Sequence, residues 1–218
     1  MNVPQTNKDE TINGSEIISR MLSAESIDTV FGIPDPSLFA LCTSLETNGI
    51  KLISPTHDTN AVHMAGAYAR ITGKVGVCIA GKGVGLANAL SGVAVDNAEG
   101  HRVLLISSVA ADGNPGSHDK GAYRYLPQLD ATRPITKWNS TIPSVLKISD
   151  VMCKAFRLSH TGKPGVVHVD VPEKILNTSC SFDPSWIRDP DTYRSLEPVA
   201  PLSELVEKAA DMPARAKF

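Results

Sequence analysis

The sequence lacks several features that would point to other classes of protein. Neither sign of charge is in excess, since 21 Lys and Arg stand against 23 Asp and Glu. This balance excludes the basic surface expected of a nucleic-acid or acidic-membrane binder. No apolar run approaches the roughly 18 residues that span a bilayer, and residues 1–11 are polar. We therefore expect a cytoplasmic protein with no nucleic-acid or membrane partner.

Paired cysteines are also missing. Cys42, Cys78, Cys153 and Cys180 are widely scattered, without the spacing of a zinc site or a redox couple. We interpret them as buried or incidental thiols in a reducing cytosol. We also find no internal repeat and no low-complexity tract.

Short apolar β segments alternate with stretches of helical periodicity along the chain. Six β segments are predicted, at Thr29–Phe31, Ile50–Ser54, Val75–Ala80, Val103–Ile106, Ile135–Trp138 and Gly165–Val171. Because helices separate most of them, we expect a mostly parallel sheet covered on both faces. The predicted fold class is a three-layer α/β/α domain with about six strands.

Residues with strong positional preferences predict where several helices begin and end. Asn13 and Asp35 are suited to cap the first two helices, and Asp35 is followed by Pro36. A third helix, rich in small residues, runs from Asn60 to Ile71 and is stopped by Gly73. Residues 174–201 read as a surface linker, and a last helix begins near Ser203.

Ligands of parallel sheets bind at the carboxyl ends of the strands. The loops expected at that edge are Gly32–Asp35, Pro55–Asp58, Gly81–Gly85 and Val109–Lys120. We therefore searched these four loops for residues that could carry chemistry.

The glycine-rich turn has two interpretations. Gly76–Gly83 matches a phosphate-binding loop until its last position, where Gly83 replaces the Ser or Thr that would bind magnesium. The first glycine would also lie inside a strand. A nucleotide-binding module therefore stays an alternative to glycines that simply allow a close approach of the turn to a neighbour or ligand.

Asp58 also has two interpretations from its own surroundings. It follows a strand and precedes a helix, so it is suited to be an N-cap. The alternative is a carboxylate poised to bond a ligand nitrogen. His57 and His63 could orient such a ligand, although a packed His63 and a solvated His118 are the simpler assignments.

Several separated segments resemble the acetolactate synthase group of thiamine-diphosphate enzymes. They are Val30–Pro34, Thr56–Arg70, Thr72–Asn88, Gly121–Tyr123, Arg133–Trp138 and Gly165–Pro172. Their order, spacing and span over residues 12–175 are similar to the family's N-terminal, pyrimidine-binding domain.

The resemblance implies a cofactor, thiamine diphosphate (also called pyrophosphate), held between this domain and a diphosphate-binding domain of a neighbouring subunit. It assigns to Asp58 the carboxylate that bonds N1′ of the aminopyrimidine. The other residues it places at the cofactor are Ile33, Pro34, Asp35, Gly83, Val84, Gly85 and Asn88. The residues it places toward a small 2-oxo acid substrate are His118, Tyr123 and Arg124.

Five positions depart from the family's usual pattern. Asp58 stands where Glu is usual, and Asp35 and Val84 replace a Gly and a Pro. Tyr123-Arg124 replaces a Phe-Gln pair, which suggests an anionic group on the substrate for Arg124. An Asp is one methylene shorter than a Glu, and a displacement of about 1 Å can cost roughly a hundredfold in rate.

The family's Mg²⁺–diphosphate motif is not found in this sequence. We therefore expect the Mg²⁺ ligands on another domain, no metal site here and no activity of this chain alone. The expected organisation is a tail at 1–11, the pyrimidine-binding domain at 12–175, and a linker with the start of a truncated following domain at 176–218.

The resemblance leaves several alternatives open. The chain could be a fragment or one subunit of a split enzyme, and a homodimer or tetramer is expected. A flavin (FAD), as in some relatives, has no support in the sequence. The hypothesis of a different class is a non-catalytic descendant that binds or scaffolds a partner.

Overall fold

The computed structural model describes residues 10–109, 124–197 and 200–215. Its main sheet has six strands, all parallel, which confirms the predicted α/β class. In spatial order the strands are β3 (Lys51–Ile53), β2 (Thr29–Gly32), β4 (Gly76–Ala80), β5 (Val103–Val109), β7 (Val166–Pro172) and β6 (Trp138–Thr141).

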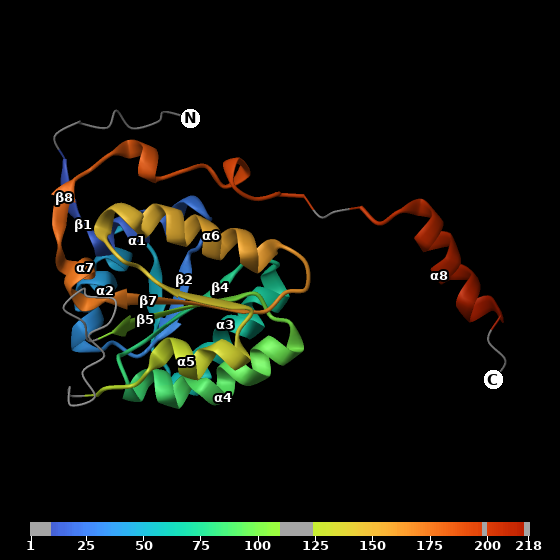
Figure 1. Cartoon of the computed structure of the whole chain (residues 1–218), viewed down its shortest axis with the longest axis horizontal. Helices are drawn as coiled ribbons and strands as arrows, with labels where there is room; N and C mark the ends of the chain where they lie inside the picture. Colours follow the sequence, from blue (N-terminus) through green and yellow to red (C-terminus); the bar gives the residue numbers. More distant parts are fainter. Residues whose placement is uncertain (1–9, 110–123, 198–199, 216–218) are drawn as a thin grey trace.

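Helices cover both faces of this sheet (Figure 1). One layer contains α1 (Gly14–Ala24), α2 (Phe39–Thr47) and α6 (Ile148–His160); the other contains α3 (Asp58–Thr72), α4 (Val84–Glu99) and α5 (Gln128–Thr132). Successive side chains of a buried strand point to opposite faces of the sheet, so they pack alternately against the two helix layers. Val77 and Ile79 pack in the core beneath α1 and α6, whereas Cys78 and Ala80 pack beneath α3 and α4.

A small second sheet was not predicted. β1 (Thr11–Asn13) pairs antiparallel with β8 (Ser179–Ser181), 168 residues apart at Ile12 and Cys180. The remaining elements are α7 (Glu173–Asn177), α8 (Ser203–Arg215) and the 3₁₀ helices η1 (Pro36–Leu38), η2 (Arg133–Ile135), η3 (Val145–Lys147), η4 (Pro184–Trp186) and η5 (Pro190–Thr192).

The segment after β7 packs against the domain rather than running free over its surface. α7 begins within it, Phe182 is buried, and Trp186 and Tyr193 pack against the core. The linker interpretation is therefore wrong for most of 174–193, whereas the domain boundaries themselves stay a prediction. The helix expected near Ser203 is present as α8, and its residues 203–213 are exposed.

The predicted strand Ile135–Trp138 is wrong in position. Arg133–Ile135 form η2 instead, and β6 begins at Trp138. Pro134 lacks an N–H and cannot donate to a strand ladder. The first donor toward β7 is the N–H of Lys137, which bonds the carbonyl of Val166 at 2.8 Å.

Three predicted helix boundaries are confirmed. The Asn13 side chain accepts from the N–H of Glu16 at 2.9 Å, and Asp35 accepts from the N–H of Ser37 at 3.0 Å. Gly73 ends α3 with a φ of +73°, a left-handed conformation that glycine adopts without strain. Within the described residues, no helix has the length and apolar character needed to cross a bilayer.

Candidate functional site

Three of the four predicted loops meet at the carboxyl edge of the sheet. Residues 32–35 follow β2, 55–58 follow β3, and 81–85 follow β4. These strands are parallel neighbours, so their carboxyl ends lie side by side. The fourth loop, with His118 and Tyr123, lies outside the described residues, which resume at Arg124.

Asp58 is not the N-cap of α3. The cap is His57, whose ring nitrogen Nδ1 accepts from the N–H of Thr59 at 3.3 Å, and Asp58 is the first helical residue. The N-cap interpretation of Asp58 is therefore wrong. Its side chain is turned inward instead, and the residue is only 7% exposed.

The Asp58 carboxylate faces the glycine turn and α4. Its Oδ2 accepts a long hydrogen bond from Nδ2 of Asn88, at 3.4 Å. A Cβ at Gly85 would lie 3.4 Å from Asp58 Oδ1, so glycine leaves room beside the carboxylate. Burial raises the pKa of Asp58 above its ordinary value, and the charge of Asp35 adds to this, while Asn88 and His57 oppose it.

Asp58→Asn is expected to stabilise the domain at neutral pH. A carboxyl whose pKa is raised by folding stabilises the folded state only while it is protonated, and that stability is lost as the pH rises through the folded pKa. Denaturant unfolding at pH 7 should therefore give a higher midpoint for the Asn variant. The gain should shrink toward pH 4; a gain that grows on acidification would contradict the raised pKa.

The glycine turn is packed against its neighbours at two further points. A Cβ at Gly81 would lie 2.7 Å from Cγ of Asp35, and one at Gly83 would lie 2.0 Å from the carbonyl oxygen of Arg124. Gly83 also has a φ of +63°, which disfavours any other residue. The turn therefore needs glycine at these positions so that its backbone can lie close to Asp35 and Arg124. This agrees with the interpretation in which the glycines simply allow a close approach to a neighbour.

The phosphate-loop interpretation of the turn finds little support. Gly76 lies in β4, as the sequence indicated. Lys82 Nζ is paired with the Glu173 carboxylate at 2.8 Å, and the N–H of Gly83 is bonded to Gln128 Oε1 at 2.8 Å. Both groups that would hold a nucleotide phosphate thus have other partners.

Asp35 and Arg124 form an ion pair across this edge. Arg124 Nη1 lies 2.6 Å from Asp35 Oδ2, and Arg124 has a left-handed φ of +61°. Burial raises the pKa of Asp35, but hydrogen bonds from Ser37 and the Arg124 guanidinium outweigh it and hold the pKa below its usual value. Two of the residues that depart from the family pattern therefore contact each other.

The other predicted site residues lie at the same edge. Ile33 is half-buried and Pro34 exposed in the loop after β2, where they offer apolar surface. Val84 begins α4 and is 57% exposed. Asn88 lies one turn further along α4, and its carbonyl accepts from the Thr59 hydroxyl.

Comparison with known proteins identifies the family to which this chain belongs. Residues 12–131 match the family described as "Thiamine pyrophosphate enzyme, N-terminal TPP binding domain". The chain belongs to the thiamine pyrophosphate enzymes.

Curated relatives agree with this assignment. The chain is 32% identical over 178 residues to "Acetolactate synthase isozyme 3 large subunit" of Escherichia coli (strain K12), covering 81% of this chain and 30% of that protein. It is 30% identical over 172 residues to "Probable acetolactate synthase large subunit" of Methanococcus aeolicus, covering 79% and 28%. The chain thus spans about three tenths of the length of the relatives it matches.

The described residues at this edge offer groups that fit the pyrimidine end of thiamine pyrophosphate. Asp58 offers a buried carboxylate beside a glycine, with the apolar Ile33 and Pro34 at the same edge. No group of three or more His, Cys, Asp or Glu among the described residues could hold a metal ion. The chemistry of this edge therefore suits a heterocycle.

Sequence reasoning missed a buried polar network that supports the glycine turn. Gln128 donates to Asp170 at 2.6 Å and to the carbonyl of Ser108 at 3.1 Å, while it accepts from Gly83. Asp170 also accepts from the Ser107 hydroxyl, which bonds the His168 ring at 2.6 Å. The signal was present, because His168 and Asp170 are polar residues inside an otherwise apolar strand.

A second cluster missed by sequence reasoning joins α3 to α4. Asp96 is 1% exposed and contacts Nδ1 of His63 at 2.7 Å and Nδ1 of His101 at 2.6 Å. Gly66 makes room for it, since a Cβ there would lie 1.7 Å from Asp96 Oδ1. His63 is therefore hydrogen-bonded rather than simply packed.

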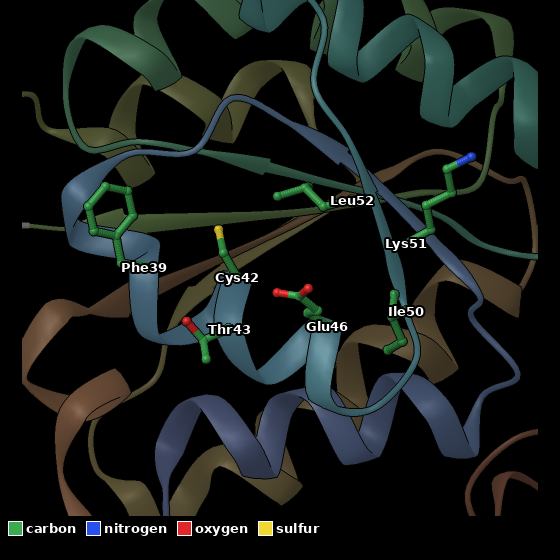
Figure 2. Close-up of a pocket in the computed structure, with 7 residues that line it drawn as sticks. All are labelled: Phe39, Cys42, Thr43, Glu46, Ile50, Lys51 and Leu52. Atoms are coloured by element: carbon green, nitrogen blue, oxygen red, sulfur yellow. The ribbon is translucent and has the colours of Figure 1, made fainter.

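A groove of about 600 Å³ beside the edge strand β3 contains none of the predicted site residues. Figure 2 shows its lining, in which Phe39, Cys42 and Glu46 of α2 face Leu52 of β3. The Lys51 ammonium points away from it. We assign it no part in the cofactor site.

Proposed function

We propose that this chain supplies the pyrimidine half of a thiamine pyrophosphate site in a 2-oxo acid decarboxylase or carboligase of acetolactate synthase type. The observation that carries the proposal is the inward-facing Asp58 carboxylate between Gly85 and Asn88. The names of the curated relatives support the reaction class. We further propose that Mg²⁺ and the diphosphate are held by another domain of the same or a second chain, in a cytoplasmic homodimer or tetramer.

In this proposal different residues of the chain contact different parts of the pyrimidine ring and hold it in place. Thiamine pyrophosphate, when bound, supplies the carbanion chemistry that breaks the bond to the 2-oxo acid's carboxylate. Asp58 exchanges a proton with N1′ of the pyrimidine, and burial raises the pKa of its carboxyl above the ordinary value. Ile33 and Pro34 offer apolar contact to the ring, and Gly83, Val84 and Gly85 form the floor beneath it.

The test is cofactor-dependent turnover by the native protein with its natural partner domain. We expect CO₂ release from a small 2-oxo acid such as pyruvate, only when thiamine pyrophosphate and Mg²⁺ are both present. A native protein that binds neither cofactor nor 2-oxo acid would favour the non-catalytic scaffold instead.

We also propose that the Asp35–Arg124 pair controls which 2-oxo acids are accepted. The family resemblance assigns Arg124 to the substrate side, and Asp35 already holds its guanidinium at 2.6 Å. A second carboxylate on a substrate would therefore have to compete with Asp35. This makes monocarboxylic 2-oxo acids the expected class.

Asp35→Gly is expected to shift the substrate preference toward 2-oxo dicarboxylic acids. Releasing Arg124 from an ion pair worth about 1 kcal/mol should raise the ratio of kcat/KM for 2-oxoglutarate over pyruvate by about fivefold. Glycine is a tolerable N-cap, so η1 should persist. The double variant Asp35→Gly, Arg124→Gln should lose the gain, and an unchanged ratio in the single variant would refute this role.

A further inference from the structure

A second hollow lies at the amino edge of the sheet, opposite to Asp58. Its walls come from residues just before β4, β5 and β7, from the last turn of α6, and from the segment after η5. Its volume is about 1180 Å³. The lining residues that matter for its chemistry are Arg102, Arg157, His160, Asp191, Arg194 and Glu197.

Two arginines of this hollow lack partners within the part of the chain that the structure describes. Neither Arg102 nor Arg157 has a side-chain hydrogen bond or an ion pair there, and Nε of Arg102 is buried without an acceptor. An unsatisfied buried donor destabilises the folded state, and more so when it is charged. Such a group calls for a partner, which an ordered water, an ion or a ligand can supply.

The hollow also holds an uncharged hydrogen-bonding ring. Burial lowers the pKa of His160 to about 4, and the charges of Arg194, Arg102 and Lys137 add to this, against the opposing charge of Glu25. His160 is therefore neutral at pH 7 and can donate one hydrogen bond. Its lowered pKa also reports the positive potential of these surroundings.

The carboxylates near this hollow do not neutralise the positive charges of Arg102 and Arg157. Glu25 is engaged by Arg194, whose Nη2 lies 2.5 Å from Oε2, and by the Tyr193 hydroxyl at 2.5 Å. Asp191 and Glu197 are exposed at the rim, where solvent and salt screen their charge.

The end of α6 does not account for these arginines either. Basic residues are common where a helix ends, because its last carbonyls are unpaired. Lys137 also lies at this helix end, where it donates to the carbonyls of Thr161 and Lys163 just beyond the helix. Arg102 comes from the start of β5 and not from the helix.

We propose that this hollow binds a small phosphate-bearing anion through the guanidinium groups of Arg102 and Arg157. Guanidinium is planar and pairs with two phosphate oxygens at once, which an ammonium cannot do. The His160 ring adds a neutral donor. The site lies at the opposite edge of the sheet from the proposed cofactor site and does not depend on it.

The test is isothermal titration of the native protein with inorganic phosphate, after saturation with thiamine pyrophosphate and Mg²⁺ so that the proposed cofactor site is filled. We expect saturable binding that Arg157→Gln and Arg102→Gln each weaken at least tenfold. Arg157 is exposed, so its variant keeps the fold even if Arg102→Gln does not. Arg133→Gln is the matched control, since Arg133 is a 70% exposed arginine paired with Asp130 outside the hollow.

Three results would overturn the proposal. One is no saturable phosphate binding, as expected if an acidic side chain from elsewhere in the native protein fills the hollow. Another is binding that survives both substitutions in the hollow. The third is binding that Arg133→Gln weakens equally, which would show general attraction of anions to surface charge.

Discussion

Asp58→Ala in the native enzyme is expected to lower kcat by roughly 10²–10⁴-fold, the usual contribution of a positioned acid–base group. The substitution removes the buried carboxylate between Gly85 and Asn88 and leaves the proposed pyrimidine without a partner for N1′. It also removes a buried charge, so the fold should survive. Steady-state turnover of pyruvate at saturating thiamine pyrophosphate and Mg²⁺ measures the effect.

Two further variants make the result for Asp58 specific. Asp58→Glu places the family's usual residue at this position and is expected to retain at least tenfold more activity than Asp58→Ala. Asp130→Ala removes an exposed carboxylate that is paired with Arg133 and should leave kcat unchanged. Undiminished turnover in Asp58→Ala would refute the catalytic role and favour the scaffold hypothesis.

Gln128→Ala is expected to destabilise the domain by roughly 2–4 kcal/mol. Gln128 is 2% exposed, and its loss leaves the Gly83 N–H and part of the Asp170 carboxylate without their partners. Each unsatisfied buried group costs about 1–3 kcal/mol, and the vacated space adds to the loss. Urea unfolding of the wild type and the variant measures the free energy difference.

Gln128→Met separates hydrogen bonding from volume, because methionine has a similar size and makes no comparable bonds. Most of the loss should remain in this variant if the network stabilises the glycine turn. A loss below about 0.5 kcal/mol would mean that solvent or a rearranged turn satisfies Gly83 and Asp170.

The sequence predicted those features of the fold that depend on only a few neighbouring residues. The caps at Asn13 and Asp35 and the stop at Gly73 are properties of a few neighbouring residues, and the structure bears them out. The apolar run of β4 could belong only to a buried strand. These elements, taken in order, were enough to predict a parallel sheet with helices on both faces.

Contacts between residues far apart in the sequence could not be predicted from such local signals. β1 pairs with β8 through two three-residue strands, too short to show a period, and contact between Asp35 and Arg124 joins residues 89 positions apart. The surroundings of Asp58 in the sequence allow either an N-cap or a ligand-binding carboxylate, and the structure shows that His57 is the cap. Only the packing of α3 against α4 and the glycine turn shows that the Asp58 carboxylate lies inside the domain.

The most direct test of the account is a crystal structure of the native protein with thiamine pyrophosphate and Mg²⁺ bound. We predict that an Asp58 carboxylate oxygen lies within hydrogen-bond distance, about 2.6–3.2 Å, of the pyrimidine N1′, with Gly83 to Gly85 beneath the ring. A cofactor bound with its pyrimidine away from Asp58, or a native protein that binds no cofactor under these conditions, would contradict the central claim.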